Sequence, residues 1–305
     1  MAVSGADLVV YMAMNKPTND VSTAGGDINS SIRATFDDPS SAATIKFFST
    51  SSSDTQNVAV TGRVSAGTIT TETIALSGTT TVTSSNTYER VLTCVLSSGA
   101  AGVVTASGNS VNKLTDIPAT ESGFCRPFYD ATASTSASKT LYDKVFVKNN
   151  NSTSTLSNAT LIEVSSGLYS SIQFGLENDK KSAQTISNRT SVPTGIGGGF
   201  GAGPSGMVSD ELTAGDYQGV WLQLSLSAGE AATNSYYEVQ VSGTTAYVWH
   251  LHQTKDCVNN PPRSASLLWT SPISLEREKL FRGLRVLIPK KKGAIQAILA
   301  LLVQV

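Results

Sequence analysis

The stretch "NVAVTGRVSAGTITTETIALSG", from Asn57 to Gly78, decides the fold class. Apolar and polar side chains alternate in it, with a turn signal, Ala-Gly, in the middle. Successive side chains of a β-strand point to opposite faces, so a period of two predicts two strands that each bury one face. The apolar residues expected to point inward are Val58, Val60, Ile69, Ile74 and Leu76.

The same pattern continues outward from this stretch. Between Thr44 and Gly99, short β-rich runs are separated by Ser-Ser, Thr-Gly and Ser-Gly. Strands that recur about every 8 to 12 residues with turn signals between them indicate a sandwich or a barrel. In the last of these runs, "RVLTCVLS", Cys94 is expected to be a small buried hydrophobic residue on a strand.

The composition of the whole chain agrees with this interpretation. Of 305 residues, 77 are Ser or Thr and 25 are Gly, while charged residues make up only 15%. Thr, Val, Ile and Tyr favour strands, whereas Ser, Gly and Asn favour the turns between them. The sequence therefore predicts an all-β protein with two tandem antiparallel β-sandwiches and a C-terminal extension.

Two changes in composition set the expected domain bounds. The segment "ATASTSASKT", residues 131–140, has nothing large to bury and indicates a linker. After Ala246 Ser and Thr become scarce, with 71 in residues 1–246 and 6 in the rest. Residues 1–246 carry 20 acidic and 13 basic side chains, and the rest carries 3 and 9. We expect an N-terminal sandwich over 1–130, a second sandwich over 131–246, and an extension over 247–305.

Two segments of similar composition mark places where the chain turns. "IPATESGF", from Ile117 to Phe124, and "LTAGDYQGVW", from Leu212 to Trp221, share an apolar residue, an Ala, an acid and a Gly before a strand. Both resemble the crossing loop of bacterial immunoglobulin-like sandwiches, and this resemblance implies that each crosses between sheets. The alternating runs "VWLQLSL" and "YYEVQVSG" after the second segment predict a hairpin of two core strands, with Trp221 used for packing.

The extension contains the residues expected to make contacts with other proteins. Its last apolar run, residues 294–305, is too short to span a bilayer and needs a protein surface, its own or a neighbour's. The extension is either a docking arm or a segment joined by a change of reading frame. The expected interface residues are Leu280, Phe281, Leu284, Val286, Ile288, Ile295, Ile298, Leu299 and Leu302.

No motif in the chain carries a clear chemistry. His250 and His252 lie two residues apart near Asp256 and Cys257, but a full metal-ligand set is not visible. The glycine-rich stretch "GIGGGFGAGPSG" lacks the Lys-Ser/Thr ending of a phosphate loop and is expected to be a flexible surface loop. No G-x-S-x-G elbow is present. We expect a protein that is not an enzyme and binds no cofactor.

Several acidic and basic groups resemble parts of sites but are more simply explained as turns. Asp210, Glu211 and Asp216 lie near Trp221, as in sugar-cleaving sites, yet acids at strand ends are more simply solvated turn residues. Asp37 and Asp38 before a proline indicate a turn, with a calcium site as the alternative. The lysines of "PKKKG" are too few to predict nucleic-acid binding, and the net charge of -1 gives no reason to expect an anionic membrane as partner.

The most distinctive pieces are "YDKVFVKNNNST", from Tyr142, and "AGDYQGVWLQL", from Ala214. Together with "DLVVYMAMNKP" near the N-terminus, they resemble tailed-bacteriophage virion structural proteins with tandem immunoglobulin-like β-sandwiches. The resemblance covers roughly residues 5–246. It implies an accessory protein of the capsid, neck or tail, made in the bacterial cytoplasm, that assembles with itself and with other virion proteins. The alternative is a receptor- or carbohydrate-binding module of a tail fibre.

Overall fold

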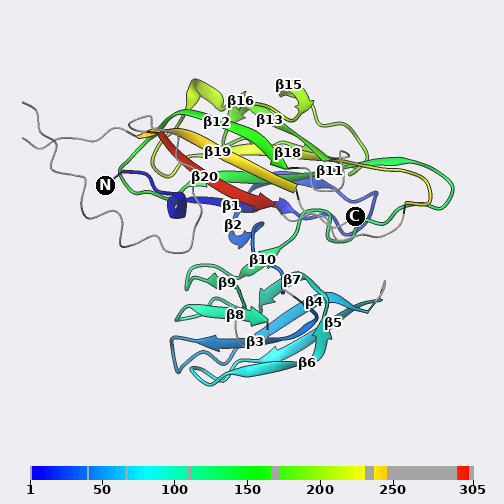
Figure 1. Ribbon diagram of the computed structural model, residues 1–305, viewed down its shortest axis with the longest axis vertical. Helices are drawn as coiled ribbons and strands as arrows, with labels where there is room; N and C mark the ends of the chain where they lie inside the picture. Colours follow the sequence, from blue (N-terminus) through cyan, green and yellow to red (C-terminus); the bar gives the residue numbers. More distant parts are fainter. Residues whose placement is uncertain are drawn as a thin grey trace, which may run out of the picture. The chain divides into compact units, whose positions relative to one another are not determined.

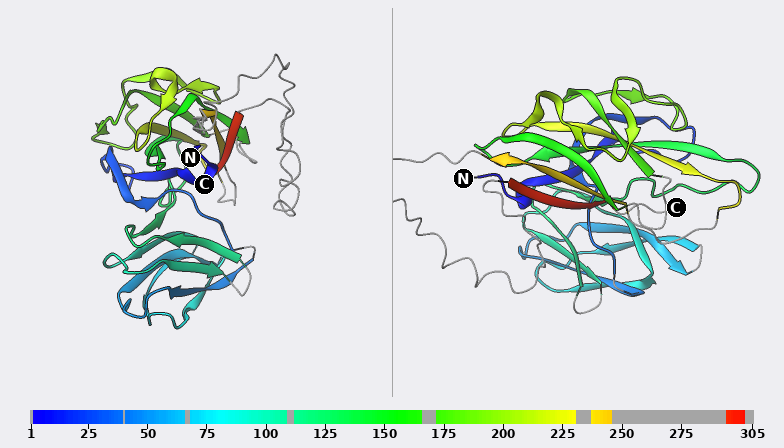
Figure 2. Two further views of the ribbon diagram at one scale, coloured as in Figure 1. Left: turned by 90° about the vertical axis from the view of Figure 1, so that its left-hand side faces the viewer. Right: turned by 45° about the horizontal axis from the view of Figure 1, so that its top comes forward.

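The computed structural model describes residues 2–39, 41–65, 68–108, 112–165, 172–230, 237–245 and 294–301. Almost all regular structure in these residues is β-strand, and the two helical segments, η1 (Gly5–Asp7) and η2 (Val208–Asp210), are three-residue 3-10 turns. The predicted all-β class is confirmed. The arrangement is that of paired sheets around apolar cores, the β-sandwich principle (Figures 1 and 2).

The described strands fall into two halves along the chain. Those of the first half are β1 (Leu8–Asn15), β2 (Ala24–Arg33), β3 (Ala43–Ser49), β4 (Asn57–Ser65), β5 (Thr68–Ala75), β6 (Val82–Tyr88), β7 (Arg90–Leu96), β8 (Val104–Gly108), β9 (Asn112–Ile117) and β10 (Gly123–Cys125). Those of the second half are β11 (Lys139–Asn149), β12 (Leu156–Ser165), β13 (Ile172–Lys180), β14 (Thr185–Ile186), β15 (Ile196–Gly201), β16 (Ser205–Gly206), β17 (Glu211–Leu212), β18 (Tyr217–Leu226), β19 (Tyr237–Thr245) and β20 (Ala294–Leu301).

One long sheet contains eleven of the described strands. Its order is β15-β13-β18-β11-β1-β2-β10-β7-β4-β5, with β14 also paired to β2. Neighbours are antiparallel except β10 and β2, which run parallel through Gly123 opposite Ile32 and Phe124 opposite Arg33. Two smaller sheets have the orders β16-β12-β19-β20, with β17 beside β12, and β6-β3-β8-β9.

The first core lies between the five-stranded sheet and the part of the long sheet formed by β13, β18, β11 and β1 (Figure 1). Its residues come from both ends of the described chain, from Val3 to Ala34 and from Cys125 to Val241. The N-terminal strand β1 belongs here because it pairs with β11 over five positions. Its six consecutive buried residues, Leu8–Ala13, need cover on both faces, which a central strand of a sheet receives.

The second core lies between the four-stranded sheet and the other end of the long sheet, and all its residues fall between Phe36 and Phe124. The expected division at residue 130 therefore does not follow the observed cores. Residues 3–34 contribute to the same core as residues 125–241, and the second core is inserted between them in sequence. The predicted linker 131–140 leads into β11.

Within the second core, most of the predicted inward-facing residues are buried as expected. Val58 and Val60 are fully buried, and Ile74 and Leu76 are nearly so. Ile69 is the exception: it is half exposed, because it lies five residues before Ile74 on β5 and a period of two places these two side chains on opposite faces. Cys94 is completely buried on β7, as predicted.

Strand β18 shows both faces of the long sheet in use. Val220, Leu222, Leu224 and Leu226 belong to the first core, which confirms the predicted alternation. Trp221 points to the opposite face, where it is fully buried in a small outer cluster with Ala24, Tyr142 and Ile186. Trp221 is thus a packing residue, although it does not lie between the paired sheets.

Both predicted crossing segments do connect different sheets. The segment before Phe124 leads from β9 in the four-stranded sheet to β10 in the long sheet, and the segment before Trp221 leads from β17 in the five-stranded sheet to β18 in the long sheet. In the first segment Gly123 has φ +149°, and a Cβ there would lie 2.0 Å from the carbonyl oxygen of Cys94. Only glycine allows this approach.

Two local predictions are wrong. Strands β18 and β19 do not form a hairpin, because β18 pairs with β11 and β13 whereas β19 pairs with β12 and β20 in another sheet. The glycine-rich stretch is not a loop throughout: residues 196–201 form β15, which pairs with β13 at the edge of the long sheet. Ile196 and Phe200 pack against the Trp221 cluster and hold this strand in place.

Candidate functional site

The C-terminal strand β20 contains the described members of the predicted interface, Ile295, Ile298 and Leu299. The remaining predicted residues lie outside the described part of the chain: Leu280, Phe281, Leu284, Val286, Ile288 and Leu302. β20 forms the outer strand of the five-stranded sheet, next to β19 (Figure 1). The structure thus brings three of the nine predicted residues to one sheet edge.

β20 is paired to β19 along its whole length. The antiparallel register runs without a shift from Tyr237 opposite Leu301 to Thr244 opposite Ala294. Paired residues of an antiparallel ladder share one face of the sheet. Positions 295, 297, 299 and 301 therefore share the face of the buried β19 residues, and positions 294, 296, 298 and 300 share the other face.

β19 itself is held firmly from its other side. Tyr237, Val239 and Val241 are buried in the first core, and seven residue pairs join β19 to β12. The hydroxyl groups of Thr160 and Ser242 are hydrogen-bonded at 2.7 Å. Gly243 is required by close packing, since a Cβ there would lie 2.6 Å from Cγ of Leu156. β19, the strand to which β20 pairs, is therefore anchored by β12 on its other side and by the first core.

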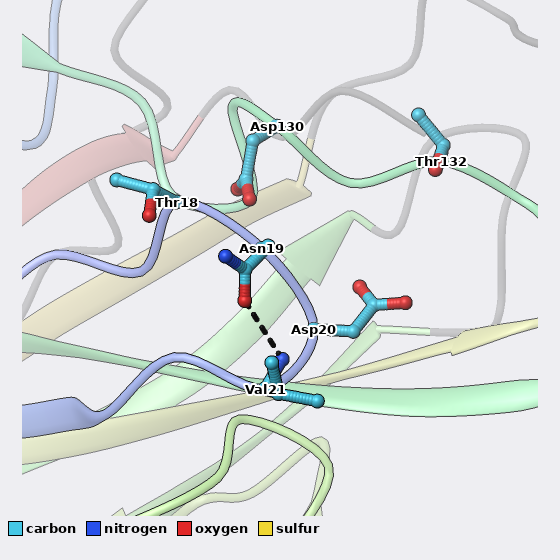
Figure 3. A pocket seen from close by; sticks show the side chains of 6 residues that line it. All are labelled: Thr18, Asn19, Asp20, Val21, Asp130 and Thr132. Carbon is cyan, nitrogen blue, oxygen red and sulfur yellow. Dashed lines mark hydrogen bonds between the residues drawn. The ribbon is translucent and has the colours of Figure 1, made fainter.

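A surface hollow of about 350 Å³ is formed by the β1–β2 connection and the segment after β10. Figure 3 shows Asp130 and Thr132 opposite Thr18, Asn19, Asp20 and Val21. The turn in the β1–β2 connection is fixed by the side chain of Asn19, whose Oδ1 accepts a hydrogen bond from the backbone N–H of Val21 at 3.0 Å (Figure 3).

Both carboxylates of this hollow are engaged by cations. Asp20 accepts a hydrogen bond from Lys139 Nζ at 2.6 Å, and Asp130 accepts one from Arg189 Nη1 at 2.7 Å. Arg189 also binds Asp143, at 2.9 Å through Nε. Carboxylates that serve as general acid and base need separate pKa values and access to a substrate proton. In the hollow, each carboxylate instead neutralises a basic side chain.

The acids near Trp221 do not converge on a site. Burial alone raises the pKa of Asp216, but hydrogen bonds from Lys181, at 2.6 Å, and from Thr213 lower that pKa below its ordinary value. Trp221 is fully buried and donates its indole N–H to Glu177 at 2.9 Å. Asp216 therefore stays ionised as the partner of a lysine.

The acidic pair before Pro39 is more than a solvated turn. Asp38 accepts a hydrogen bond from Arg126 Nη2, and Arg90 lies 3.7 Å away through Nε. Burial lowers the pKa of Arg126 to about 9, although the nearby Asp38 opposes this shift. Asp38 ties the start of the inserted core to two buried arginines.

The candidate metal ligands and the basic cluster are the remaining predictions from the sequence. His250, His252, Asp256 and Cys257 lie outside the described residues, as do the lysines 290–292. Across the described ranges, no group of three or more His, Cys, Asp or Glu side chains is positioned to hold a metal ion. Burial raises the pKa of the Cys125 thiol to about 12, so this thiol stays protonated.

One arrangement of polar side chains is not visible in the sequence pattern. Glu121, which is almost fully buried, accepts two hydrogen bonds from Arg33, one of them at 2.9 Å through Nη2, and one from Tyr11 Oη at 2.9 Å. Asn150 in turn donates to Tyr11 Oη at 3.0 Å. This cluster joins the end of the inserted core to the first core. The acid is present in "ESGF", but its partner lies 88 residues earlier in the chain.

Exposed aromatic side chains are rare on the described surface. Among the described Phe, Tyr and Trp residues, Phe48 is the most exposed, with 36% of its surface accessible. Rings that stack on sugars are expected to be exposed in the free protein.

Comparison with known protein families, with curated proteins and with solved structures finds no significant match for this chain. Neither of the helical turns in the described part of the chain has the length or apolar character that would let a helix cross a membrane.

Proposed function

We propose that this chain is a non-enzymatic structural component of a bacteriophage virion, which assembles by protein-protein contacts through its C-terminal region. The observation that carries the proposal is the position of β20. An apolar strand from beyond the break in composition pairs with β19 at the margin of a β-sandwich body. Strand addition to a sheet edge is a general mode of protein association.

The nature of the strand supports an assembly role. Seven of its eight residues, in the sequence AIQAILAL, are Ala, Ile or Leu, and the eighth is Gln296. Natural sheets protect their edge strands with charges, prolines or bulges. β20 has none of these in its register with β19. In an isolated molecule such a strand favours aggregation, whereas in a lattice a neighbouring copy can cover it.

The ionisable groups support the same proposal. The carboxylates of the described hollow are ion-paired, and Asp216 and Asp38 also bind basic side chains. Because each of these carboxylates is bound to a basic side chain, it stabilises the fold and is not free to act as a general acid, a general base or a nucleophile.

The test is the composition of purified particles produced from the genome that encodes the chain. We expect the protein to be present in a fixed copy number, which peptide mass spectrometry with labelled standards measures. Hundreds of copies would indicate a capsid or tail-tube position, and six or twelve would indicate the neck or baseplate. Absence from the particles would overturn the proposal. The same peptides show whether residues 247–305 follow Ala246 in the natural protein.

A matched pair of variants tests the role of the strand. Leu299 lies opposite the buried Val239, whereas Gln296 lies opposite Ser242 on the other face. We expect Leu299→Arg to reduce incorporation into particles at least tenfold and Gln296→Arg to leave it near the wild-type level. Truncation after Ala246 should give a folded protein that is not incorporated. Equal incorporation of both arginine variants would contradict the proposed role of β20.

A further inference from the structure

Strand β19 carries the edge to which β20 pairs, and among the described strands β20 alone lies on that side of β19. In the sheet order β16-β12-β19-β20, removal of β20 leaves β19 at the margin with its backbone groups free on that side. Eight register pairs, from 237–301 to 244–294, occupy this edge. Unpaired backbone groups at such an edge are a ready template for a strand from another chain.

The connection between the two strands does not favour a strand from the same chain. Antiparallel neighbours can be joined by a two-residue hairpin, and Thr244 opposite Ala294 would be suitable ends for one. Instead, residues 246–293, a stretch of 48, separate β19 from β20. A chain of this length spans up to roughly 160 Å when fully extended, which exceeds the diameter of a small domain several times.

The pairing energy is the same for a strand of either origin, since the residue pairs are identical. The choice then depends on local concentration. A short flexible tether presents its own strand at an effective concentration on the order of millimolar, and this value falls as the tether lengthens. Copies packed side by side in a lattice present their strands at a similar concentration. Exchange of identical elements is therefore a low-cost route to association.

From these observations we infer that β20 of one copy pairs with β19 of a neighbouring copy in the assembled protein. Each copy then gives residues 294–301 to one neighbour and accepts the same strand from another. Such a head-to-tail contact forms closed rings or open helical filaments. The inference rests on the proposed structural function, and it names a second copy of this chain as the partner of the β19 edge.

Cysteine pairs placed across the register test the exchange. Ser242 and Gln296 are opposite each other, at the spacing that a disulfide needs. Two proteins, each of full length and carrying Cys257→Ser to remove one native thiol, bear either Ser242→Cys or Gln296→Cys. The native Cys94 and Cys125 are completely buried. The two proteins are co-expressed, purified together at high concentration and oxidised under mild conditions.

In an equal mixture the neighbour is the other variant in half of the contacts, so the exchange predicts that about half of this material runs as a covalent heterodimer on a non-reducing gel, with a 242–296 disulfide found by peptide mass spectrometry. The double variant Ser242→Cys/Gln296→Cys is then expected to give a ladder of covalent multimers. A double variant that forms only disulfides within one chain, or no 242–296 disulfide at all, overturns the inference whatever its oligomeric state.

A variant in which β20 can pair only with β19 of its own chain is the control, and it shows that a disulfide can form between positions 242 and 296. When residues 246–292 are replaced by Asn-Gly, a four-residue hairpin loop joins Thr244 to Ala294. In this variant the same cysteine pair must form its disulfide within one chain. Particle composition is measured separately. Cross-linked copies in solution together with absence from particles would keep the exchange and overturn the virion role. Presence in particles with disulfides only within one chain would keep the virion role and overturn the exchange.

Discussion

The two cores of this chain both bury apolar side chains between two sheets, but different stretches of sequence form them. The inserted core uses residues from Phe36 to Phe124 in one continuous segment, whereas the first core joins residues 3–34 to residues 125–241. Each core contains a fully buried arginine beside a phenylalanine: Arg126 lies over Phe36 at 4.1 Å, and Arg189 lies over Phe128 at 5.2 Å.

The difference between these arginines is in their partners. Asp143, the partner of Arg189, has only 1% of its side chain exposed, while Asp38, the partner of Arg126, has 30% exposed. The discontinuous core is therefore cross-linked internally by a desolvated ion pair, and the continuous core is tied at its margin. A core made from distant segments has a larger entropic cost of closure, and specific internal contacts help to define how its segments meet.

The largest effect is expected from removing the two arginine side chains in turn. Arg189→Met leaves Asp143 buried without its cation and should destabilise the protein by about 3–5 kcal/mol. Arg126→Met leaves Asp38 partly solvated and near Arg90, so about 1–2 kcal/mol is expected. Urea denaturation followed by circular dichroism measures both values.

The double variant Arg189→Met/Asp143→Asn is the control for this comparison. Removing both charges should recover part of the stability lost in Arg189→Met, because the fully buried Asp143 position then carries no uncompensated charge; the loss at the more exposed Asp130 is not recovered. If Arg126→Met proved the more damaging change, the contrast between an internal and a marginal ion pair would be lost.

The next effect concerns the glycines of the two crossing segments. Gly123→Ala places a Cβ 2.0 Å from the Cys94 carbonyl oxygen, and we expect a loss of roughly 3 kcal/mol or more. Gly215 also has a positive φ, +76°, but no atom lies within 4 Å of the position that a Cβ would take, so Gly215→Ala should cost about 1 kcal/mol. Thermal unfolding of the two variants tests the difference, and equal losses would mean that backbone strain outweighs the clash.

Local patterning predicted those features that depend on neighbouring residues. The alternation of Val58 and Val60, and of Val220 to Leu226, indicated which side chains point inward, because the period of a strand is independent of its partners. The burial of Cys94 followed from the same pattern. The all-β class followed from composition.

Features that depend on which strands meet were beyond local patterning. The pairing of β1 with β11 joins Leu8 to Asn149, and nothing in either segment alone identifies the other. The hairpin prediction for β18 and β19 failed for the same reason: adjacent alternating runs are compatible with one sheet or with two. Of the candidate site, the apolar run at residues 294–305 was recognised, but its acceptor edge on β19 required the topology.

A smaller effect is expected from the titration of Asp54 in the inserted core. Its carboxylate accepts hydrogen bonds from Ser49 Oγ and from the backbone N–H groups of Ala101 and Gly102. The bond from Ser49, followed by those from the backbone, lowers the pKa of Asp54 below its ordinary value despite burial. The stabilisation is thus complete above the unfolded-state pKa near 4 and is lost as the pH falls through the lower folded-state pKa.

Asp54→Asn should lower the melting temperature by several degrees at neutral pH, and the difference from wild type should shrink as the pH falls below about 4. Differential scanning calorimetry across this range provides the measurement. The exposed Asp179 offers a matched control, since Asp179→Asn should leave the curve nearly unchanged. A constant difference between Asp54→Asn and wild type at every pH would contradict the assignment.

The smallest perturbation uses the two buried thiols, one in each core. Cys94 belongs to the inserted core and Cys125 to the first core, and both side chains are fully buried. Burial raises the pKa of both thiols, so neither reacts with a disulfide reagent until its core opens. In a Cys257→Ser background, we expect Cys94 to be labelled at a lower urea concentration than Cys125, because the inserted core is the smaller of the two. Mass spectrometry of the labelled peptides distinguishes the two sites. Simultaneous labelling would mean that the long sheet, which continues through both cores, unfolds as a single cooperative unit.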